Sequence, residues 1–474
     1  MSYFGKTSLG NYRFNPILLL VAGLVSVISA MPYAGSWFDG SRLAAVECLV
    51  DYHTWQIDQS IFLGTASRHA APADYPYGPN DTQYNLEGTK DKVFINGHFY
   101  SEKTPVVSLG MAAVYQVLQW TTGLKAAAHP RIFCYVMTLL CNGSVYVFAI
   151  ACLDLMIASL GLATAARLLL TYSFALGTIA LPFLRYINNG IPMLAVFAAI
   201  YLLIAKFTEP GWATFSKMQL AAIGALMGLG YAIDLGVGPI LVLGVTGYIA
   251  YLTRSWRSVA LVLAASFPFF VLHHVINYMI GGTFKPINTV PAYFQWPGSP
   301  FSGPNLNGTG WMHSSFGEYL RYSLEMQISR VGFINHDPVL FLALLGLALL
   351  LREKFQEKSA VFFSLFLIGG TWQIYAITTD NYSGSVCAVR WFIPLLVPFY
   401  YILAVFLKRH PQYLGDLAIL SGWSFFLGLM MWHDGPWTRS PVPAIWYIMG
   451  GTLLSWIAYR IYCQFAKSNA PTPG

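Results

Sequence analysis

The stretch PVLFLALLGLALLLREK, residues 338–354, decides the fold class of this chain. No polar side chain interrupts it before Arg352, and a membrane-spanning helix needs about 20 mostly apolar residues because the hydrocarbon core is about 30 Å thick. Comparable apolar runs start near Pro16, Arg131, Thr164, Gly190, Met218, Leu235, Ser258, Pro338, Ala360, Trp391, Gly415 and Pro443. The chain is therefore predicted to be an all-α integral membrane protein with about 12 transmembrane helices.

The composition agrees with this prediction. Of the 474 residues, 56% are hydrophobic and 10% are charged, and the mean hydropathy is +0.54. Soluble domains carry roughly 25% charged residues, so a soluble enzyme of this length is excluded. The formal net charge of +7 comes from basic residues grouped at the ends of apolar runs, which predicts no nucleic-acid partner. The six cysteines are scattered without a CxxC pair, so neither a disulfide framework nor a zinc site is indicated.

One further run, residues 105–123, is broken by Ser108, Gln116 and Gln119 and is predicted to lie flat at the membrane interface. The positive-inside rule supports that choice, because both termini and the basic groups between spans then lie in the cytoplasm. Those groups are Lys6 and Arg13, Arg167, Lys206 and Lys217, Arg254 and Arg257, Arg352, Lys354 and Lys358, Lys408 and Arg409, and Arg460 and Lys467. The first run is expected to be an uncleaved anchor and not a signal peptide.

The prediction is one polytopic domain over residues 1–474 in the plasma (inner) membrane. Its parts are the N-terminus and first span (1–34), a first outer loop with interfacial helices (35–130), spans 2–7 (131–277), a second outer loop (278–337), spans 8–12 (338–465) and a short cytoplasmic tail (466–474). Since the cytoplasmic loops are all short, the chemistry is expected on the extracytoplasmic (periplasmic) face.

The first outer loop opens with WFDGSRLAAVECLVD, residues 37–51. Its apolar residues recur at helical spacing, which predicts an amphipathic interfacial helix with Glu47 and Asp51 on its wetter side. Asp39 lies just before this helix, where a carboxylate either caps the helix or takes part in chemistry near the lipid headgroups.

A β-hairpin is predicted further along the same loop. The string DKVFINGHFYSEKTP, residues 91–105, contains Asn96-Gly97 between alternating apolar flanks, which is a strong hairpin signal. Such a hairpin delivers Tyr100 and Lys103 to the start of the interfacial helix. A lysine at the outer membrane surface either meets a lipid phosphate or anchors headgroups in the ordinary way.

Two of these stretches resemble a known family. FDGSRLAAVECLV (residues 38–50) and GHFYSEKTPVVSLGMAAVY (residues 97–115) are similar to the opening of GT-C superfamily glycosyltransferases, in the branch of protein O-mannosyltransferases and lipid A aminoarabinose transferases. The resemblance matches Asp39 to the acid that follows the first span in that branch and Arg42 to the basic residue after it. Tyr100, Lys103 and Pro105 match a Lys-Pro-Pro motif that leads into a membrane-hugging helix.

Three positions depart from that branch. Gly40 replaces the usual second acid, Thr104 replaces the first proline, and the turn after the third span reads RYINN, residues 185–189, where the branch often has an acid. The likeness is specific over roughly the first 130 residues and architectural afterwards. The missing second acid leaves Asp39 as the one candidate metal ligand, and the cofactor is a divalent cation (Mg²⁺ or Mn²⁺) or none.

The resemblance implies transfer of a hexosyl or pentosyl unit, with inversion, from a polyprenyl-phosphate donor in the bilayer to a hydroxyl of a lipid-linked glycan or envelope polymer. That reaction needs a base for the acceptor hydroxyl and cations for the departing phosphate. Asp39 is the expected catalytic base. The expected donor-phosphate partners are Lys103, Arg185 and Arg390, although either arginine can instead snorkel at a helix end. Further substrate contacts are expected from Arg42, Glu47, Tyr100, His98 and Asn188.

The second outer loop is rich in Gly, Pro, Asn and aromatic residues and is expected to cover the site and contact the acceptor. Residues 318–330 within it are predicted to form an amphipathic helix.

Three other functional classes compete with a transferase. A transporter or flippase would carry its polar residues near the midplane, on broken helices in two repeated halves. A polysaccharide polymerase or ligase would place its key cations on a late loop and would not need Asp39. A structural subunit of an envelope assembly would use the outer loops only for binding. The spans are poor in midplane charges, which favours the transferase over the transporter.

Overall fold

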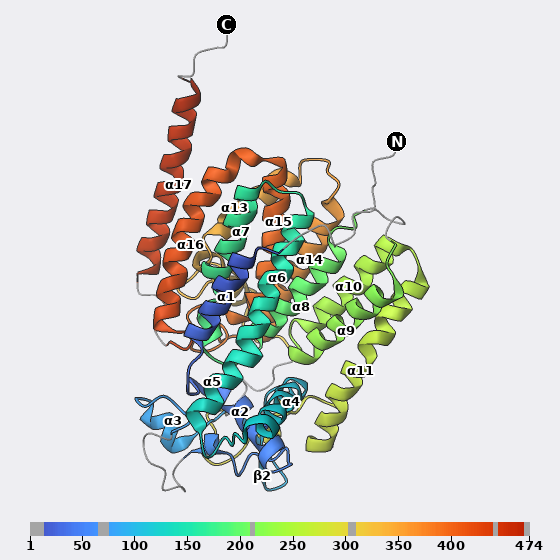
Figure 1. The fold of residues 1–474 in the computed structure, drawn as a ribbon, viewed down its shortest axis with the longest axis vertical. Coiled ribbons are helices and arrows are strands. Elements are labelled where there is room, and N and C mark those ends of the chain that lie inside the picture. The colour runs from blue at the N-terminus through green and yellow to red at the C-terminus, as the bar shows by residue number, and fades with distance from the viewer. Residues whose placement is uncertain (1–13, 65–74, 209–213, 302–309, 439–443, 469–474) are drawn as a thin grey trace.

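The computed structural model describes residues 14–64, 75–208, 214–301, 310–438 and 444–468, and these are mostly helical. Long helices run side by side in a bundle, and a layer of shorter elements closes one end of it (Figure 1). We call this layer the base. It consists of α2 (Trp37–Asp51), α3 (Thr82–Glu87), the hairpin of β1 (Lys92–Ile95) and β2 (His98–Ser101), and α4 (Pro105–Thr122).

Every apolar run of the sequence forms a helix over at least part of its length. These helices are α1 (Pro16–Ser29), α5 (Pro130–Thr138) with α6 (Ser144–Ser159), α7 (Thr164–Leu176), α8 (Gly190–Ile204), α9 (Lys217–Ile233), α10 (Gly238–Thr253), α11 (Trp256–Gly281), α13 (Val339–Leu350), α14 (Lys358–Thr378), α15 (Leu396–Arg409), α16 (Leu414–Asp434) and α17 (Ile445–Ser468). A short 3-10 helix, Arg390–Leu395, leads into α15, and α12 (Phe316–Glu325) lies in the second outer loop. The expected start of the last run, Pro443, lies outside the described residues.

Five helical segments of the described chain are long and apolar enough to cross a membrane: Pro130–Ser159, Trp256–Gly281, Lys358–Thr378, Arg390–Arg409 and Pro411–Asp434. Several other apolar helices are shorter. The run at residues 338–354, for example, forms α13 over only 12 residues, because the helix starts after Pro338 and ends before the charged Arg352. The chain is a membrane protein by these criteria, and its count of 12 spans stays a prediction.

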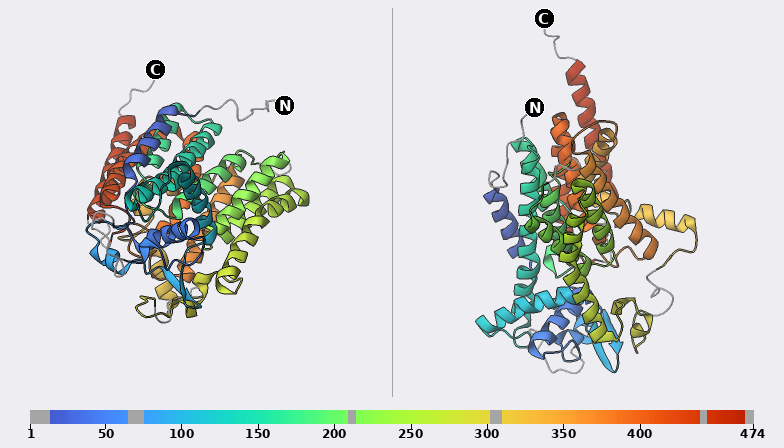
Figure 2. Two further views of the ribbon diagram at one scale, coloured as in Figure 1. Left: turned by 60° about the horizontal axis from the view of Figure 1, so that its bottom comes forward. Right: turned by 90° about the vertical axis from the view of Figure 1, so that its right-hand side faces the viewer.

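α4, predicted as an interfacial helix, lies crosswise to the bundle helices at the base (Figure 2, right). It packs on α2, and its buried face contains Met111, Ala112 and Tyr115. The opposite face is exposed, with Trp120 among the most exposed side chains. This two-faced burial fits a helix lying between protein and headgroups, and its depth in a bilayer stays a prediction.

The environment predicted for the helix after Asp39 is wrong. α2 starts at Trp37 and is buried on nearly all sides in a second hydrophobic core below the bundle. Glu47, expected on a wetter side, is 0% exposed and accepts hydrogen bonds from the Ser60 hydroxyl (2.6 Å) and the Ile61 amide (3.0 Å). The cause is tertiary: the chain after α2 and the whole of α4 fold over the face that the periodicity assigns to solvent.

The hairpin prediction is confirmed. β1 pairs antiparallel with β2, Lys92 opposite Ser101 and Ile95 opposite His98. Asn96 (φ 51°) and Gly97 (φ 88°) both adopt the left-handed backbone that a two-residue turn of this kind requires.

The base also explains why residue 40 is a glycine. A Cβ at Gly40 would lie 2.2 Å from the Tyr77 hydroxyl oxygen and 2.8 Å from Cζ of the same ring. Tyr77 is held in place, since its hydroxyl donates to the Phe62 carbonyl (3.0 Å) and its ring is fully buried. No side chain fits at position 40 while Tyr77 occupies that space.

Gly40→Ala is therefore expected to destabilise the protein by about 1–3 kcal/mol through overpacking against Tyr77. Thermal unfolding of the purified chain in detergent measures this effect. The matched control is Gly23→Ala in α1, where an added Cβ meets nothing within 4 Å. Equal melting temperatures for the two variants would contradict the packing described for α2.

Candidate functional site

A polar cavity of about 770 Å³ lies where the base meets the bundle. Its walls come from the start of α2, α3, the feet of the hairpin, the loop at 381–386, the helix that begins at Arg390, and the end of α16. We call it the ionic cavity, because its lining includes the charged residues Asp81, Asp91, Glu102, Lys103, Arg390 and Asp434. Phe38, Trp391 and Trp437 add aromatic surface.

Lys103 is the centre of the charged lining. Its Nζ donates to Asp91 Oδ2 at 2.6 Å and also to the Glu102 carboxylate. The lysine and both acids keep only a small exposed fraction of their side chains, 9% for Lys103, 14% for Asp91 and 17% for Glu102. One ammonium therefore holds two carboxylates at the cavity surface, leaving a local excess of negative charge beside it.

The cations of the site gather around one ring. Lys103 Nζ lies 4.2 Å from the Phe38 ring centroid, and the Arg390 guanidinium carbon lies 4.3 Å from it. Arg390 also lies 5.0 Å from the Trp437 ring. Because the face of an aromatic ring attracts cations, Phe38 keeps Lys103 and Arg390 close together despite their like charge.

Burial shapes the protonation of Glu102. Removal from water raises its pKa, and the neighbouring Asp91 raises it further, whereas Lys103 and Arg390 lower it. The ionised form of Glu102 therefore depends on the cations beside it.

Arg42 lies behind the cavity wall. It is 0% exposed, its guanidinium donates to Asn189 Oδ1 (2.5 Å) and to the Thr104 carbonyl (3.5 Å), and its carbon lies 5.7 Å from the Phe38 ring. Burial lowers its pKa to about 9, with Asp234 acting in the opposite direction. Arg42 thus adds positive charge below Phe38 without reaching the cavity surface.

Asp39, the expected catalytic base, also lies behind the cavity wall. It is 1% exposed, and its carboxylate accepts hydrogen bonds from the Gly35 amide (2.7 Å) and the Ser36 hydroxyl (2.5 Å). Ser36 is the N-cap of α2 and accepts from the Phe38 amide (3.2 Å), so Asp39 belongs to a helix cap. Gly35 and Ser36 line the ionic cavity, but the Asp39 carboxylate is not part of its lining. Burial raises the pKa of Asp39 to about 7, although these hydrogen bonds lower it.

Several other predicted contacts lie away from the cavity lining. Arg185 donates to the Trp432 and His433 carbonyls at the end of α16 (2.7 and 2.9 Å), so it clamps a helix terminus. Asn188 donates to the Phe183 and Tyr186 carbonyls and accepts from the Ile191 amide, which shapes the turn before α8. These hydrogen bonds of Arg185 and Asn188 are made to the backbone inside the fold.

The hairpin residues Tyr100 and His98 also face elsewhere. Tyr100 pairs with Val93 in the hairpin and bridges to Gln56. The ring of His98 contacts Asp58 at 3.2 Å on the exposed surface. Together with Glu47, these residues organise the base and do not line the ionic cavity.

The second outer loop reaches the cavity through Phe301, which lines it. The same segment packs on the hairpin, with the Trp296 ring edge-on to Phe99 at 5.5 Å between centroids. Residues 302–309 lie outside the described residues. The expected cover over the site is thus present in part, and contact with an acceptor stays a prediction.

Sequence reasoning missed Asp91 and Glu102, which are two of the four acids that line the cavity. Both stand in the hairpin string, and the turn at Asn96-Gly97 sets a register in which Asp91 comes just before β1 and Glu102 just after β2. Continuing that register by one pair places these two acids opposite each other. The turn type was therefore the signal that could have located them.

The residues of the site do not form a metal centre of ordinary composition. No group of three or more His, Cys, Asp or Glu side chains within the described ranges is placed to hold a metal ion. Asp91 and Glu102 are already bridged by Lys103, whose ammonium occupies the position between their oxygens. No step of the chemistry below is routed through a metal.

Comparisons with known proteins give a limited result. No family model and no curated protein matches the chain. Two solved structures resemble it, both of the Archaeoglobus fulgidus oligosaccharyltransferase. The complex with zinc and sulfate has a TM-score of 0.46 at 10% identity over 90% of this chain and 53% of that one. The apo form has a TM-score of 0.43 at 11% identity over 95% and 56%. The chain spans about half the length of those proteins. With TM-scores below 0.5, the likeness supports no conclusion about activity.

Asp39→Asn is expected to change how stability depends on pH. The folded-state pKa of Asp39, raised to about 7 from 3.8, means that the folded protein holds a proton that the unfolded chain releases between those values. Stability therefore falls as pH rises through this window, by up to about 4 kcal/mol in total. Thermal melts of wild type and variant across about pH 4 to 8 measure the difference, and the variant lacks this fall.

The control for this measurement is Glu87→Gln, an exposed acid on α3 outside the cavity lining. Its pH profile should follow wild type. Parallel profiles for Asp39→Asn and wild type would show that Asp39 is ionised in the folded protein and that the burial argument is wrong.

Proposed function

We propose that this chain is a membrane glycosyltransferase that moves a monosaccharide from a polyprenyl-phosphate donor to an acceptor hydroxyl at the ionic cavity, with inversion at the anomeric carbon. The observation that carries the proposal is that the cations Lys103 and Arg390 line one cavity together with the acids Asp91 and Glu102, at the end of an apolar bundle. Cations stabilise the charge that builds on a departing phosphate, and a carboxylate removes the acceptor proton.

Lys103 and Arg390 bind the donor phosphate. Both contact the Phe38 ring at just over 4 Å, so a phosphate at that edge of the cavity would meet an ammonium and a planar guanidinium together. Arg42 lies deeper and adds long-range positive charge behind the same ring. These cations come from three separate segments, namely α2, the link between β2 and α4, and the 3-10 helix that begins at Arg390, so the phosphate site forms only in the folded protein.

Glu102 is the catalytic base, with Asp91 beside it. Burial raises the pKa of Glu102, and Lys103 partly offsets this rise. When the donor phosphate takes Lys103 as its partner, Glu102 loses part of that offset, and its affinity for a proton rises further. The acceptor hydroxyl then gives its proton to Glu102 while its oxygen bonds to the anomeric carbon. The bond from that carbon to the phosphate oxygen breaks, and the lipid phosphate leaves with the electron pair.

A lipid-linked donor is favoured by an apolar groove close to the ionic cavity. This groove, of about 800 Å³, is lined by side chains of α1, α7 and α16 and by Leu181, and Trp432 lies at its end. Trp432 precedes Asp434 and Gly435 of the ionic cavity by two and three residues. The prenyl tail of the donor occupies this groove while the phosphate reaches Lys103 and Arg390.

The proposed orientation puts the ionic cavity on the extracytoplasmic side. The end of α9 lies at the base, since the Ile233 carbonyl accepts from Thr104, so Lys217 at its start lies at the other end of the bundle. Arg254 and Arg257 flank the start of α11, whose far end packs on the hairpin. Basic residues at the end opposite the cavity favour a cytoplasmic position for that end. A cavity at the bundle end also suits a transferase better than a transporter with a midplane site.

The assignment of Glu102 as the catalytic base is tested by measuring turnover with a labelled polyprenyl-phosphate sugar. Glu102→Gln is expected to lower kcat by about 10²–10⁴-fold, the usual contribution of proton removal. Lys103→Ala should reduce both donor affinity and kcat, because it loses the phosphate partner and the organiser of both acids. Glu87→Gln and Lys90→Ala, an ion pair outside the cavity lining, serve as charge-matched controls.

Asp39→Asn separates the two possible bases. With Glu102 as the base, Asp39→Asn keeps substantial turnover once its stability is taken into account. Wild-type turnover in Glu102→Gln together with loss in a well-folded Asp39→Asn would move the base to Asp39. Movement of the labelled donor without formation of a glycosidic bond would favour a flippase.

Leu429→Trp tests the prenyl groove. Leu429 lines the groove with an exposed side chain, so a larger ring narrows the groove without entering the core. We expect the KM for a long polyprenyl-phosphate donor to rise about tenfold, equivalent to about 1.4 kcal/mol, while a short citronellyl-phosphate donor is unaffected. Leu454→Trp, on the exposed face of α17, is the matched control. An equal change for both donors would place the tail elsewhere.

A further inference from the structure

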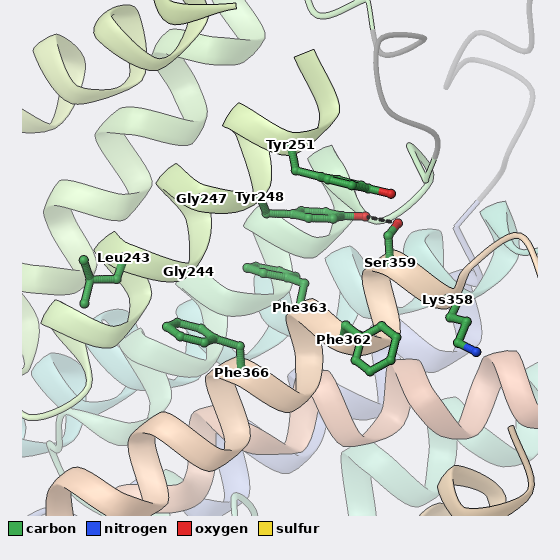
Figure 3. Close-up of a pocket in the computed structure, with 10 residues that line it drawn as sticks. All are labelled: Leu243, Gly244, Gly247, Tyr248, Tyr251, Lys358, Ser359, Phe362, Phe363 and Phe366. Carbon is green, nitrogen blue, oxygen red and sulfur yellow. Dashed lines mark hydrogen bonds between the residues drawn. The ribbon is translucent and has the colours of Figure 1, made fainter. Parts of the chain in front are cut away.

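A second lateral groove lies between α10 and α14, and the proposed transfer reaction makes no use of it. Its volume is about 580 Å³, and Figure 3 shows its lining side chains. Lys358 and Ser359, at one end of the groove, are the first residues of α14. The far end of α14 leads to the loop at 381–386 that lines the ionic cavity. The groove therefore opens towards the end of the bundle remote from the ionic cavity.

One wall of the groove is a ladder of parallel rings. The rings of Tyr248 and Phe363 are 4.7 Å apart at 8°, and those of Tyr248 and Tyr251 are 6.2 Å apart at 11° (Figure 3). A flat, apolar wall of this kind makes continuous contact with an extended hydrocarbon chain.

The space beside the ladder depends on Gly247. A Cβ at Gly247 would meet nothing within 4 Å, although this residue lies in the middle of α10. One turn away the helices close in, since a Cβ at Gly244 would lie 2.8 Å from Leu367 and 3.0 Å from Phe366. The opening is thus a local widening of the seam between α10 and α14.

The mouth of the groove is polar and positively charged. The Tyr248 hydroxyl donates to the Phe207 carbonyl (2.9 Å), and Lys206 lies over the Phe207 ring at 5.0 Å. Within the described ranges, Lys358 Nζ donates to one acceptor, the neutral Glu353 carbonyl, at 3.2 Å. Arg254 directly follows α10 on the same side.

Among the described residues, the acids Glu357 and Glu353 near this mouth are engaged with other cations. Glu357 pairs with Lys408 at 2.7 Å, and Glu353 pairs with Arg409 at 3.0 Å and with His410 at 2.9 Å. The positive charge of Lys358 is therefore not neutralised by an ion pair among the described residues. An apolar wall beside a cationic mouth suits a molecule that has a hydrocarbon chain and an anionic headgroup.

We infer that this groove binds an anionic glycerophospholipid, with an acyl chain along the aromatic ladder and the headgroup phosphate at Lys358. The charge at the mouth selects an anionic headgroup over a zwitterionic one. This site is independent of the proposed transfer reaction, and its lipid belongs to the leaflet opposite the ionic cavity.

The prenyl tail of a sugar donor does not fit this groove as well. Towards the ionic cavity the seam between α10 and α14 is closed, because a Cβ at Gly370 would lie 2.7 Å from Ile240. Just before the start of α10, a Cβ at Gly236 would lie 2.4 Å from the Tyr375 hydroxyl oxygen. A tail attached to a phosphate at Lys103 has no open path along this seam.

The test uses the full chain, purified after incubation with vesicles of phosphatidylcholine and phosphatidylglycerol in equal amounts. Native mass spectrometry then counts the lipids that each protein retains. Wild type is expected to retain phosphatidylglycerol in preference to phosphatidylcholine. Gly247→Leu, at a position where an added Cβ meets nothing within 4 Å, puts a side chain into the open space and should retain about tenfold less. Gly450→Leu, at a position on α17 that is equally open, is the matched control and should behave as wild type.

The headgroup is tested with Lys358→Gln, which should keep a bound lipid but lose the preference for phosphatidylglycerol. Lys354→Gln, an exposed lysine outside the groove lining, is the charge control. Equal retention by wild type and Gly247→Leu would overturn the proposal, as would an unchanged preference in Lys358→Gln. A lower retention of an added long-chain prenyl phosphate by Gly247→Leu, with phospholipid retention unchanged, would assign the groove to the sugar donor instead.

Discussion

The ionic cavity depends on one lysine held between two acids at the foot of a hairpin. Lys103 is the point where Asp91, Glu102 and the Phe38 ring meet, and each of these arrives from a different part of the first outer loop. Charges so close together and so little exposed are stable only when each has a partner of opposite sign, and Lys103 is the partner of both acids. The hairpin, α2 and the start of α4 must therefore adopt their mutual arrangement before the cavity exists. A binding event that engages the lysine also redistributes the charge on both acids.

The bundle contributes the other half of the same arrangement. Arg390 starts the helical segment that leads into α15, and its guanidinium lies over the Phe38 ring. An arginine at that position is the link between a late helix and an early loop. Trp437, just after α16, also contacts the guanidinium. The cavity is thus shared between segments far apart in sequence, and neither outer loop makes it alone.

Local patterns predicted those parts of the structure that local physics decides. The apolar runs became helices, because the side-chain composition of a span leaves the backbone no other way to satisfy its hydrogen bonds. Asn96-Gly97 became a hairpin turn, because its two residues tolerate positive φ. The same reasoning failed for α2, where other segments cover the face that its own periodicity leaves open. It also could not decide whether Asp39 caps or reacts, since that depends on which atoms of the chain lie in front of it.

The contact between Gly40 and Tyr77 has a consequence for how this protein can change over evolutionary time. A carboxylate at position 40 requires that the ring at position 77 shrink first, because the reverse order passes through a sterically blocked intermediate. Shrinking that ring alone opens a void in the core beneath the cavity, which carries its own penalty. Either order passes through a less stable chain, so Asp39 stays without a second acid beside it as long as Tyr77, which is outside the lining of the ionic cavity, fills that space.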